Sequence, residues 1–226
     1  NLIVADGVLN APDYTRTCTC SYQNQTSLAL VHMPGVEQWT YNAKELLPGR
    51  SVGLNFGAPG DSLAASGTFW LDMGEDGNKK PKDFREPNPN KPFKPYMFID
   101  IDGKKAECYG HHSSMFAKSP YNWVGASGII GASTIEIDTN ITTVAVRLYF
   151  AEPGAKAKTG QRVFSVSIDG TEVLKDFDAT SAAGGARKVI AKEFKYSKTD
   201  KPIEIKLTAS TGKTLLCGIE LIVEKK

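Results

Sequence analysis

Apolar and polar residues alternate with a period of two in the middle of the chain, most clearly in residues 143–150. Every second position of this run is a large apolar residue: Val144, Val146, Leu148 and Phe150. A strand with this pattern buries one face of a sheet and exposes the other to water. We therefore expect residues 143–150 to form a strand with one buried and one solvated face.

A second alternating run follows at 163–168 and ends at Asp169-Gly170, a two-residue pair typical of a tight β-hairpin. Val173 and Leu174 then begin a third strand. A few paired strands are not stable alone in water, so the rest of the chain is expected to supply a facing sheet.

Further strand candidates recur about every ten residues, with turn signals between them, which favours a β-sandwich of the jelly-roll kind. We expect residues 189–196 to pair with 202–209, and the very apolar run 215–223 to be central. No convincing amphipathic helix is found. The other candidates are 51–56, 68–72, 96–101 and 133–138.

Composition narrows the function classes. The chain has 226 residues, 41% of them hydrophobic and 23% charged, and a net charge of +2. This charge gives no electrostatic case for nucleic-acid or membrane-surface binding. No apolar run reaches the ~20 residues that a membrane-spanning helix needs. Because the chain starts at Asn1 within a strand-like run, it is expected to be a processed product or part of a longer polypeptide.

The four cysteines are at positions 18, 20, 108 and 217. No His or Cys stands at zinc spacing from the first two, which argues against a metal site. Disulfides are the preferred interpretation and imply an oxidising compartment. Cys108 and Cys217 could bridge two distant strands, and the alternative is a pair of plain buried thiols.

The chain divides into residues 1–45, a short irregular β segment, and 46–226, the main β domain. The first part has too few apolar residues for its own core and should pack on something else. Residues 73–95, rich in Gly, Asn, Lys and Pro, are expected to be a long solvated loop.

The sequence GVLNAPDYTRTCTCSYQNQTSLALVHMP, at residues 7–34, resembles the closing segment of secreted bacterial β-propeller proteins with pyrroloquinoline-quinone (PQQ)-type repeats. In that family the segment follows the last propeller blade. The propeller itself is absent here, so the resemblance implies no quinone chemistry and no cofactor. It does imply a possible protein partner through residues 1–45.

Catalytic motifs are weak. His111-His112-Ser113-Ser114 has no nucleophile elbow around it. On a strand the two histidines would point to opposite faces, one inward and one outward. Asp176 and Asp178 would lie closer together than a glycosidase pair, so turn and cap roles are favoured. The sequence predicts a protein that is not an enzyme.

Aromatic residues at strand ends and in loops suggest sugar binding instead. Sugars stack their C–H faces on such rings while polar side chains bond their hydroxyls. The alternative is that each ring belongs to the core. The candidate ligand-binding residues are Tyr109, His111, Tyr121, Trp123 and Glu152.

A second resemblance supports this interpretation. Three segments, VAVRLYFAEP, GQRVFSVSIDGTEVLKDFD and LLCGIELI, are similar to the malectin family of jelly-roll carbohydrate-binding domains, over roughly residues 50–223. The resemblance implies an all-β, malectin-like β-sandwich that binds glucose-containing oligosaccharide without catalysis. It would act within a larger secreted, periplasmic or bacterial cell-surface protein. The alternative is a structural module that docks to a propeller or to other surface proteins.

Overall fold

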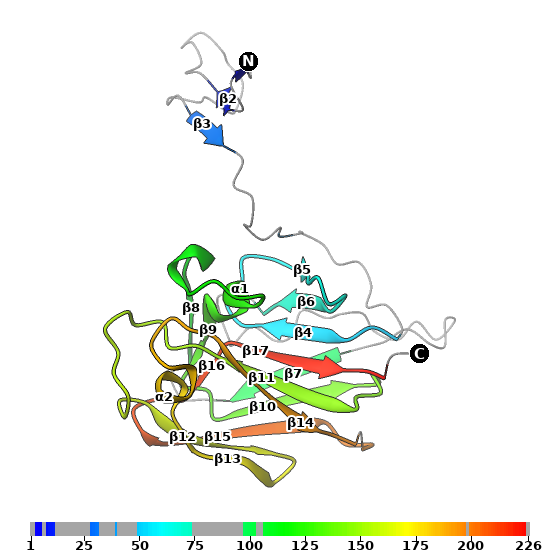
Figure 1. The fold of residues 1–226 in the computed structure, drawn as a ribbon. Helices are drawn as coiled ribbons and strands as arrows, with labels where there is room; N and C mark the ends of the chain where they lie inside the picture. Colours follow the sequence, from blue (N-terminus) through cyan, green and yellow to red (C-terminus); the bar gives the residue numbers. More distant parts are fainter. Residues whose placement is uncertain are drawn as a thin grey trace, which may run out of the picture. The chain divides into compact units, whose positions relative to one another are not determined.

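The computed structural model describes residues 3–5, 8–11, 28–31, 39, 49–73, 97–102, 106–197 and 199–224 (Figure 1). The predicted loop at 73–95 and the first two cysteines therefore lie outside the described residues, apart from residue 73. The chain divides into two compact units, Asn1–Val36 and Glu37–Lys226, and each is described by itself.

The first unit contains a three-stranded antiparallel sheet of β1 (Ile3–Ala5), β2 (Val8–Ala11) and β3 (Leu28–Val31). Its register aligns Val4, Leu9 and Leu30 across the three strands, so these apolar side chains share one face. Val4 is 74% exposed and Leu30 is 53% exposed, while Ile3, on the other face, is 55% exposed. Large apolar side chains are thus exposed on both faces.

The second unit is a sandwich of two large sheets (Figure 1). The six-stranded sheet has the order β14-β11-β17-β4-β6-β5, and the five-stranded sheet has the order β13-β12-β15-β10-β7. The first sheet comprises β4 (Val52–Asn55), β5 (Ser62–Leu63), β6 (Phe69–Asp72), β11 (Ala145–Phe150), β14 (Ile190–Lys195) and β17 (Gly218–Ile222). The second comprises β7 (Met97–Asp102), β10 (Thr134–Thr139), β12 (Val163–Ile168), β13 (Thr171–Phe177) and β15 (Ile203–Thr211).

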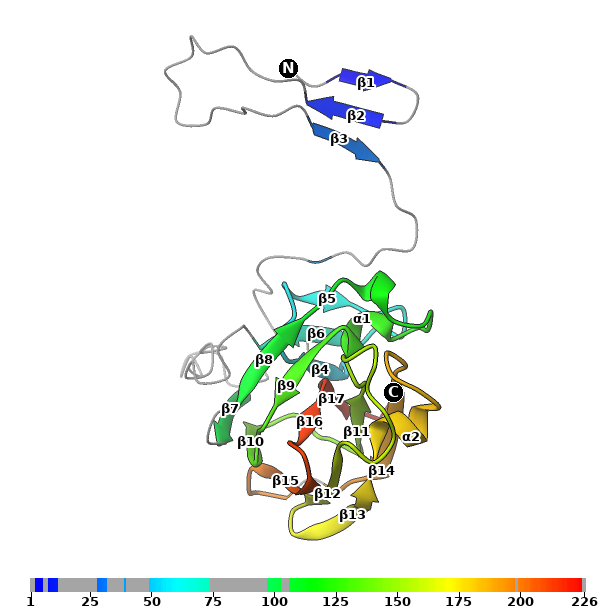
Figure 2. The same cartoon turned by 90° about the vertical axis from the view of Figure 1, so that its left-hand side faces the viewer.

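A small sheet of β8 (Glu107–Gly110), β9 (Ser127–Ile130) and β16 (Leu215–Leu216) closes one end of the sandwich, toward the viewer in Figure 2. The expected central strand 215–223 is divided between this sheet and the six-stranded one. The change occurs at Cys217, whose N–H donates to the carbonyl of Tyr149 and whose carbonyl accepts from Phe56. Its longer part, β17, lies between β11 and β4, a central position as predicted.

Side chains from the facing surfaces of the two large sheets form the main core. The alternation of β12 is confirmed, with Phe164, Val166 and Ile168 buried and the residues between them half-buried. Rings from three elements meet there, with the centroids of Phe150 and Phe177 4.8 Å apart. The core therefore follows the predicted period of two.

The hairpin at Asp169-Gly170 is confirmed, because β12 and β13 pair across it and both turn residues have positive φ, 48° and 77°. The expected pairing of 189–196 with 202–209 is wrong. The first forms β14, which pairs with β11 in the six-stranded sheet, and the second forms β15, which pairs with β12 and β10. The chain crosses between sheets there, which turn signals alone do not reveal.

The predicted solvated face of β11 is not solvated. Tyr149 is fully buried and Arg147 is half-buried, because a second apolar layer covers the outer face of the six-stranded sheet. Trp70 lies over Gly53 and Gly218: a Cβ on Gly53 would come 2.1 Å from its Cδ2 atom. Trp70 makes edge contacts with Trp123 and Tyr149, at centroid distances of 5.4 and 5.2 Å.

A buried charge network completes this face. Glu220 is 2% exposed, and its Oε2 accepts hydrogen bonds from Tyr149 at 2.6 Å and Arg147 at 2.8 Å. Its Oε1 accepts from Thr68 at 2.5 Å. Arg147 also pairs with Glu193. Burial, the largest cause, raises the pKa of the Tyr149 phenol well above its usual value, so this group acts as a neutral donor.

Candidate functional site

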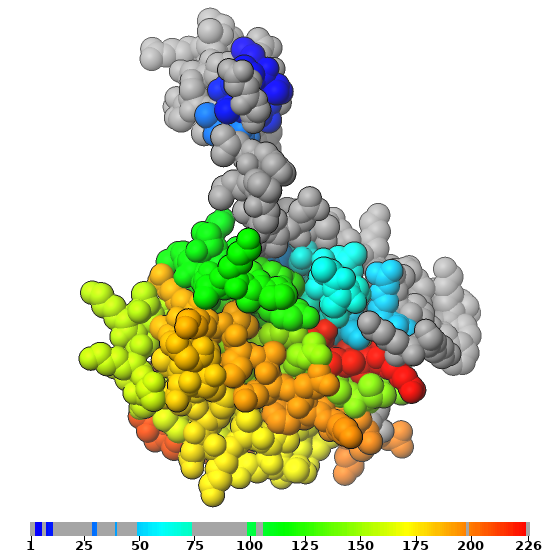
Figure 3. All heavy atoms as spheres, viewed as in Figure 1, coloured from blue at the N-terminus to red at the C-terminus, as the bar shows by residue number. Residues whose placement is uncertain are grey.

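Three loops converge at one end of the sandwich, on the left in Figures 1 and 3. Phe150 at the end of β11 pairs with Ile190 at the start of β14. Val163 at the start of β12 pairs with Thr211 at the end of β15. The connections 151–162, 178–189 and 212–214 are therefore brought to the same edge by strand register.

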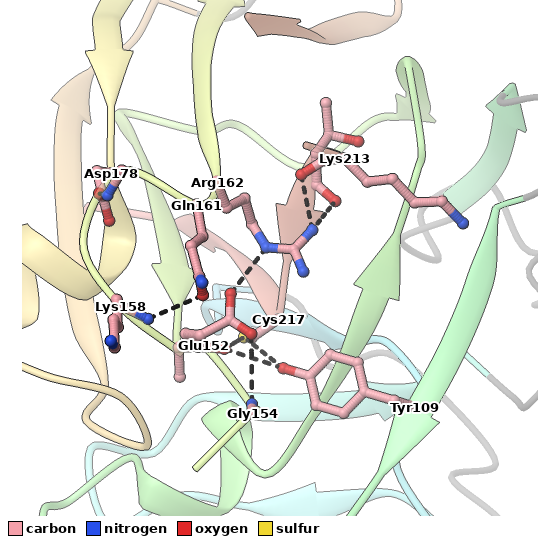
Figure 4. A network of polar contacts seen from close by, with 12 residues as sticks. Tyr109, Glu152, Gly154, Lys158, Gln161, Arg162, Asp178, Lys213 and Cys217 are labelled. Carbon is pink, nitrogen blue, oxygen red and sulfur yellow. Dashed lines mark hydrogen bonds and ion pairs between the residues drawn. The ribbon is translucent and has the colours of Figure 1, made fainter. Parts of the chain in front are cut away.

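The ion pair of Glu152 and Arg162 holds these loops together (Figure 4). Arg162 Nε donates to Glu152 Oε2 at 2.8 Å, and Gly154 N–H donates to Oε1 at 3.3 Å. Arg162 Nη1 donates to the carbonyl of Lys213 at 2.7 Å. The side chains of Glu152 and Arg162 are only 8% and 17% exposed. Glu152, a predicted sugar contact, thus has both oxygens engaged within the protein.

Arg187 fixes the first part of the loop from the other side. It has φ 56°, which is rare for a residue with a Cβ. Its N–H donates to the carbonyl of Glu152 at 2.9 Å, and its Nε donates to Pro153 at 3.0 Å. Its own carbonyl accepts from Ala117 at 2.8 Å. One residue therefore connects the 151–162 loop to the segment that carries His111.

Asp178 caps α2 (Ala179–Ala183), accepting from Ser181 N–H at 3.0 Å through Oδ1 and from Gly160 N–H through Oδ2. The predicted cap role of this carboxylate is confirmed. The segment 179–186, rich in Gly, Ala and Ser, thus begins with this short helix. Asp176 has φ 45° at a register shift of β13, and Asp178 lies beyond the end of that strand.

Tyr109 reaches into the protein from β8. Its hydroxyl lies 3.2 Å from the Ala151 carbonyl, 3.3 Å from the Gly125 carbonyl and 3.3 Å from Cys217 Sγ. Burial, together with the nearby Cys217, raises the pKa of this phenol well above its usual value. The residue as a whole is half-buried, while its hydroxyl is used inside the protein.

The expected disulfide between Cys108 and Cys217 is absent. Cys217 Sγ faces the hydroxyl of Tyr109, and neighbouring residues of a strand point to opposite sides, so Cys108 on β8 points away. Burial raises the pKa of the Cys217 thiol to about 12. The alternative of a plain buried thiol holds for Cys217, whereas Cys108 is half-buried.

His111 is exposed and stands beside Tyr109, with ring centroids 5.8 Å apart. The expected in-and-out arrangement of the two histidines is wrong, because both follow the end of β8 and both are exposed. His112 instead caps the 3-10 turn Ser113–Met115, where its Nδ1 accepts from Ser114 N–H.

Tyr121 and Trp123 belong to α1 (Asn122–Gly125) and its N-cap. Trp123 is 8% exposed, its Nε1 donates to Pro120, and its ring contacts Trp39 at a centroid distance of 5.6 Å. Tyr121 is half-buried against Tyr149, with centroids 5.0 Å apart. These two predicted residues lie on the aromatic layer of the sheet face.

The five predicted residues thus form two groups, one near Glu152 and one on α1 and its N-cap. Tyr109 and His111 form one partly exposed ring pair near Glu152, and Tyr121 and Trp123 form the other group. Arg162 lies within the GQRVF motif of the malectin resemblance, which predicts no role for it. The signal that could have found it was an arginine among small and polar residues, ten positions after the lone glutamate.

No group of three or more His, Cys, Asp or Glu side chains within the described ranges is placed to hold a metal ion. Among the same residues, no helix is long and apolar enough to cross a membrane.

The chain is similar to a known protein family in its sequence and to several solved structures in its fold. Residues 142–224 match the family model of the malectin domain. No curated protein matches the chain. The fold resembles the plant receptor-like kinase FER, at 17% identity and a TM-score of 0.51, over 78% of this chain and 43% of that chain.

Two other structures are similar. The ANX1 ectodomain from Arabidopsis thaliana matches at 17% identity and a TM-score of 0.51, over 77% of this chain and 41% of its own. A β-glucuronidase of Bacteroides uniformis matches at 12% identity and a TM-score of 0.54, over 94% of this chain but only 22% of its own. The chain thus spans less than half of each of these proteins. At these identities the likeness concerns the fold, which is a malectin-like β-sandwich whose family signature lies in residues 142–224.

Proposed function

We propose that the second unit is a non-catalytic carbohydrate-binding module, part of a larger secreted or cell-surface protein. The observation that carries the proposal is the partly exposed ring pair Tyr109–His111 at the loop end of a malectin-like sandwich. A sugar ring would stack on this pair, and polar groups of the surrounding loops would bond its hydroxyls.

The rigid setting of this ring pair supports the proposal. The Tyr109 hydroxyl is held inside, and the Glu152–Arg162 pair and Arg187 fix the adjacent loop. Binding to a site that is already ordered costs less conformational entropy. Glu152 acts in the proposal by shaping the loop, because both its oxygens are occupied.

The test is isothermal titration of the wild type and variants against soluble glucans and other glycans chosen from an array. We expect His111→Ala to weaken binding about tenfold, from the loss of one stacking partner. Tyr196→Ala is the matched control: this half-buried ring, bonded to Asp169 at 2.8 Å, should leave affinity unchanged. If the wild type binds no glycan, the proposal fails.

The second candidate is an assembly module that docks to a propeller of the PQQ type or to other surface proteins. The exposed apolar side chains on both faces of β1–β3 favour it, since such a sheet needs cover. Trp39, from the predicted segment 1–45, also covers part of Trp123. The test is a photo-crosslinker at Leu30, on the same rung as Val4, in the producing cell. Reproducible capture of one partner, lost in a Val4→Asp variant, would support assembly, and the lack of any crosslink would contradict it.

A further inference from the structure

The loop end of the sandwich carries an excess of positive charge. Lys156 and Lys158, in the loop after Glu152, are exposed, and so is Lys213, whose carbonyl binds Arg162. None of these three ammonium groups forms an ion pair within the part of the chain that the structure describes. They are therefore available to an anion from outside.

The carboxylates at the same end are already used. Glu152 is neutralised by Arg162 and accepts a further bond from Gly154. Asp178 accepts two backbone N–H groups, one at the start of α2 and one from Gly160. The exposed Asp176 is the remaining carboxylate near this edge, and its own N–H is bonded to Ser165 on β12.

Carboxylates gather on a different surface. Across the outer face of the five-stranded sheet, Asp100, Glu136 and Glu204 occupy one rung of neighbouring strands. The loop end therefore presents three exposed lysines, whereas this rung of the sheet presents three carboxylates. Such a separation steers an anionic ligand to the loop end.

Resting on the proposed carbohydrate-binding function, we infer that the ligand is an anionic polysaccharide, bearing carboxylate or sulfate groups. Its rings stack on Tyr109 and His111, and its charged groups meet Lys156, Lys158 and Lys213. Lysine ammonium groups act as point charges without the fork geometry of arginine, so the site accepts either anionic group. Because these lysines are exposed, their contribution is screened by salt.

The experiment compares two triple variants with the same change in net charge. The first carries Lys156→Gln, Lys158→Gln and Lys213→Gln. The control carries Arg50→Gln, Lys195→Gln and Lys206→Gln, all exposed and outside the loop end. Each protein is titrated with polygalacturonate, with a sulfated glycan and with a neutral glucan, at low and high salt, after its melting temperature has been checked.

We expect the wild type to prefer an acidic glycan and to lose affinity as salt rises. The first triple variant should bind that glycan about tenfold or more weakly, while the control matches the wild type. Preference for polygalacturonate or for the sulfated glycan identifies the source of the anionic group. Equal losses in both triples would mean that overall charge alone drives binding, which overturns the inference.

The two proposals fail in different ways. If the wild type binds neutral glucan as tightly as acidic glycan and the lysine triple changes neither, the inference falls and the carbohydrate-binding function stands. If it binds none of the three glycans, the proposed function itself falls.

Discussion

The outer faces of the two large sheets, which alternation alone would treat alike, are built in opposite ways. On the six-stranded sheet, Glu220, Arg147 and Glu193 alternate in sign along one rung, and Tyr149 of the aromatic layer donates to the buried Glu220. On the five-stranded sheet, the carboxylates of Asp100 and Glu136 stand directly opposite each other and are exposed. The alternation of apolar and polar residues shows which positions face away from the core. Whether such a face is covered or open to water is shown by the charges of the residues that pair across neighbouring strands.

The largest expected effect comes from Gly53→Ala. The new Cβ would stand 2.1 Å from Trp70, whose ring is fixed by Trp123 and Tyr149. We expect the free energy of unfolding to fall by about 3 kcal/mol, in the upper range for overpacking. Urea denaturation measures it. Gly110→Ala is the control, since its Cβ would meet nothing closer than 3.4 Å; an equal loss there would refute the packing explanation.

Glu220→Gln should come next. It leaves Arg147 with only the half-exposed Glu193 as a charged partner, and we expect a loss of about 2 kcal/mol. The corresponding Glu152→Gln change should cost about 1 kcal/mol and increase hydrogen exchange mainly in loop 151–162. Exchange that rises equally throughout the sandwich in both variants would show that the two ion pairs do not differ as described.

Alkaline pH should destabilise the protein. The folded-state pKa of the Cys217 thiol is raised to about 12, so its contribution is full below the unfolded pKa of about 8.5. It is lost as pH rises through the folded value, at up to about 1.4 kcal/mol per pH unit. Cys217→Ala should reduce the slope of unfolding free energy between pH 9 and 11. If the slope is unchanged in this variant, the whole loss of stability at alkaline pH comes from the buried tyrosines and none from Cys217.

The smallest effect is expected on the exposed face. Glu136→Lys converts a like-charged rung with Asp100 and Glu204 into an attractive one, and should stabilise the protein by about 0.5 kcal/mol. Thermal melting at low and high salt measures it, because the gain should shrink as salt rises. Glu172→Lys, on β13 of the same sheet and opposite Ser167, is the control and should show little gain.

The structural features that depend on residues close together in the sequence were predictable from it. The Asp169-Gly170 hairpin and the alternation of β12 depend on neighbouring residues, and both were predictable. The placement of β14 and β15 in different sheets was not, because it depends on contacts between distant segments. The same applies to the cover over Tyr149, which comes from Trp70 and α1.

The candidate site divides in the same way. Tyr109 was predicted as a stacking ring and His111 as a ligand-binding residue, and the structure brings their rings together. The contact between Tyr109 and Cys217 joins β8 to the point where the chain leaves β16, so no spacing rule could give it. The sequence alone did not predict the role of Arg162, because its ion pair with Glu152 depends on how the 151–162 loop folds.

The aromatic layer also determines what spectroscopy of this protein reports. The chain has three tryptophans, and all of them, Trp39, Trp70 and Trp123, stand edge to face in one stack. Intrinsic tryptophan fluorescence therefore monitors the outer layer of one sheet and is silent about the inner core and the loop end. A melt followed by fluorescence and one followed by circular dichroism would coincide only if that layer and the sandwich unfold together.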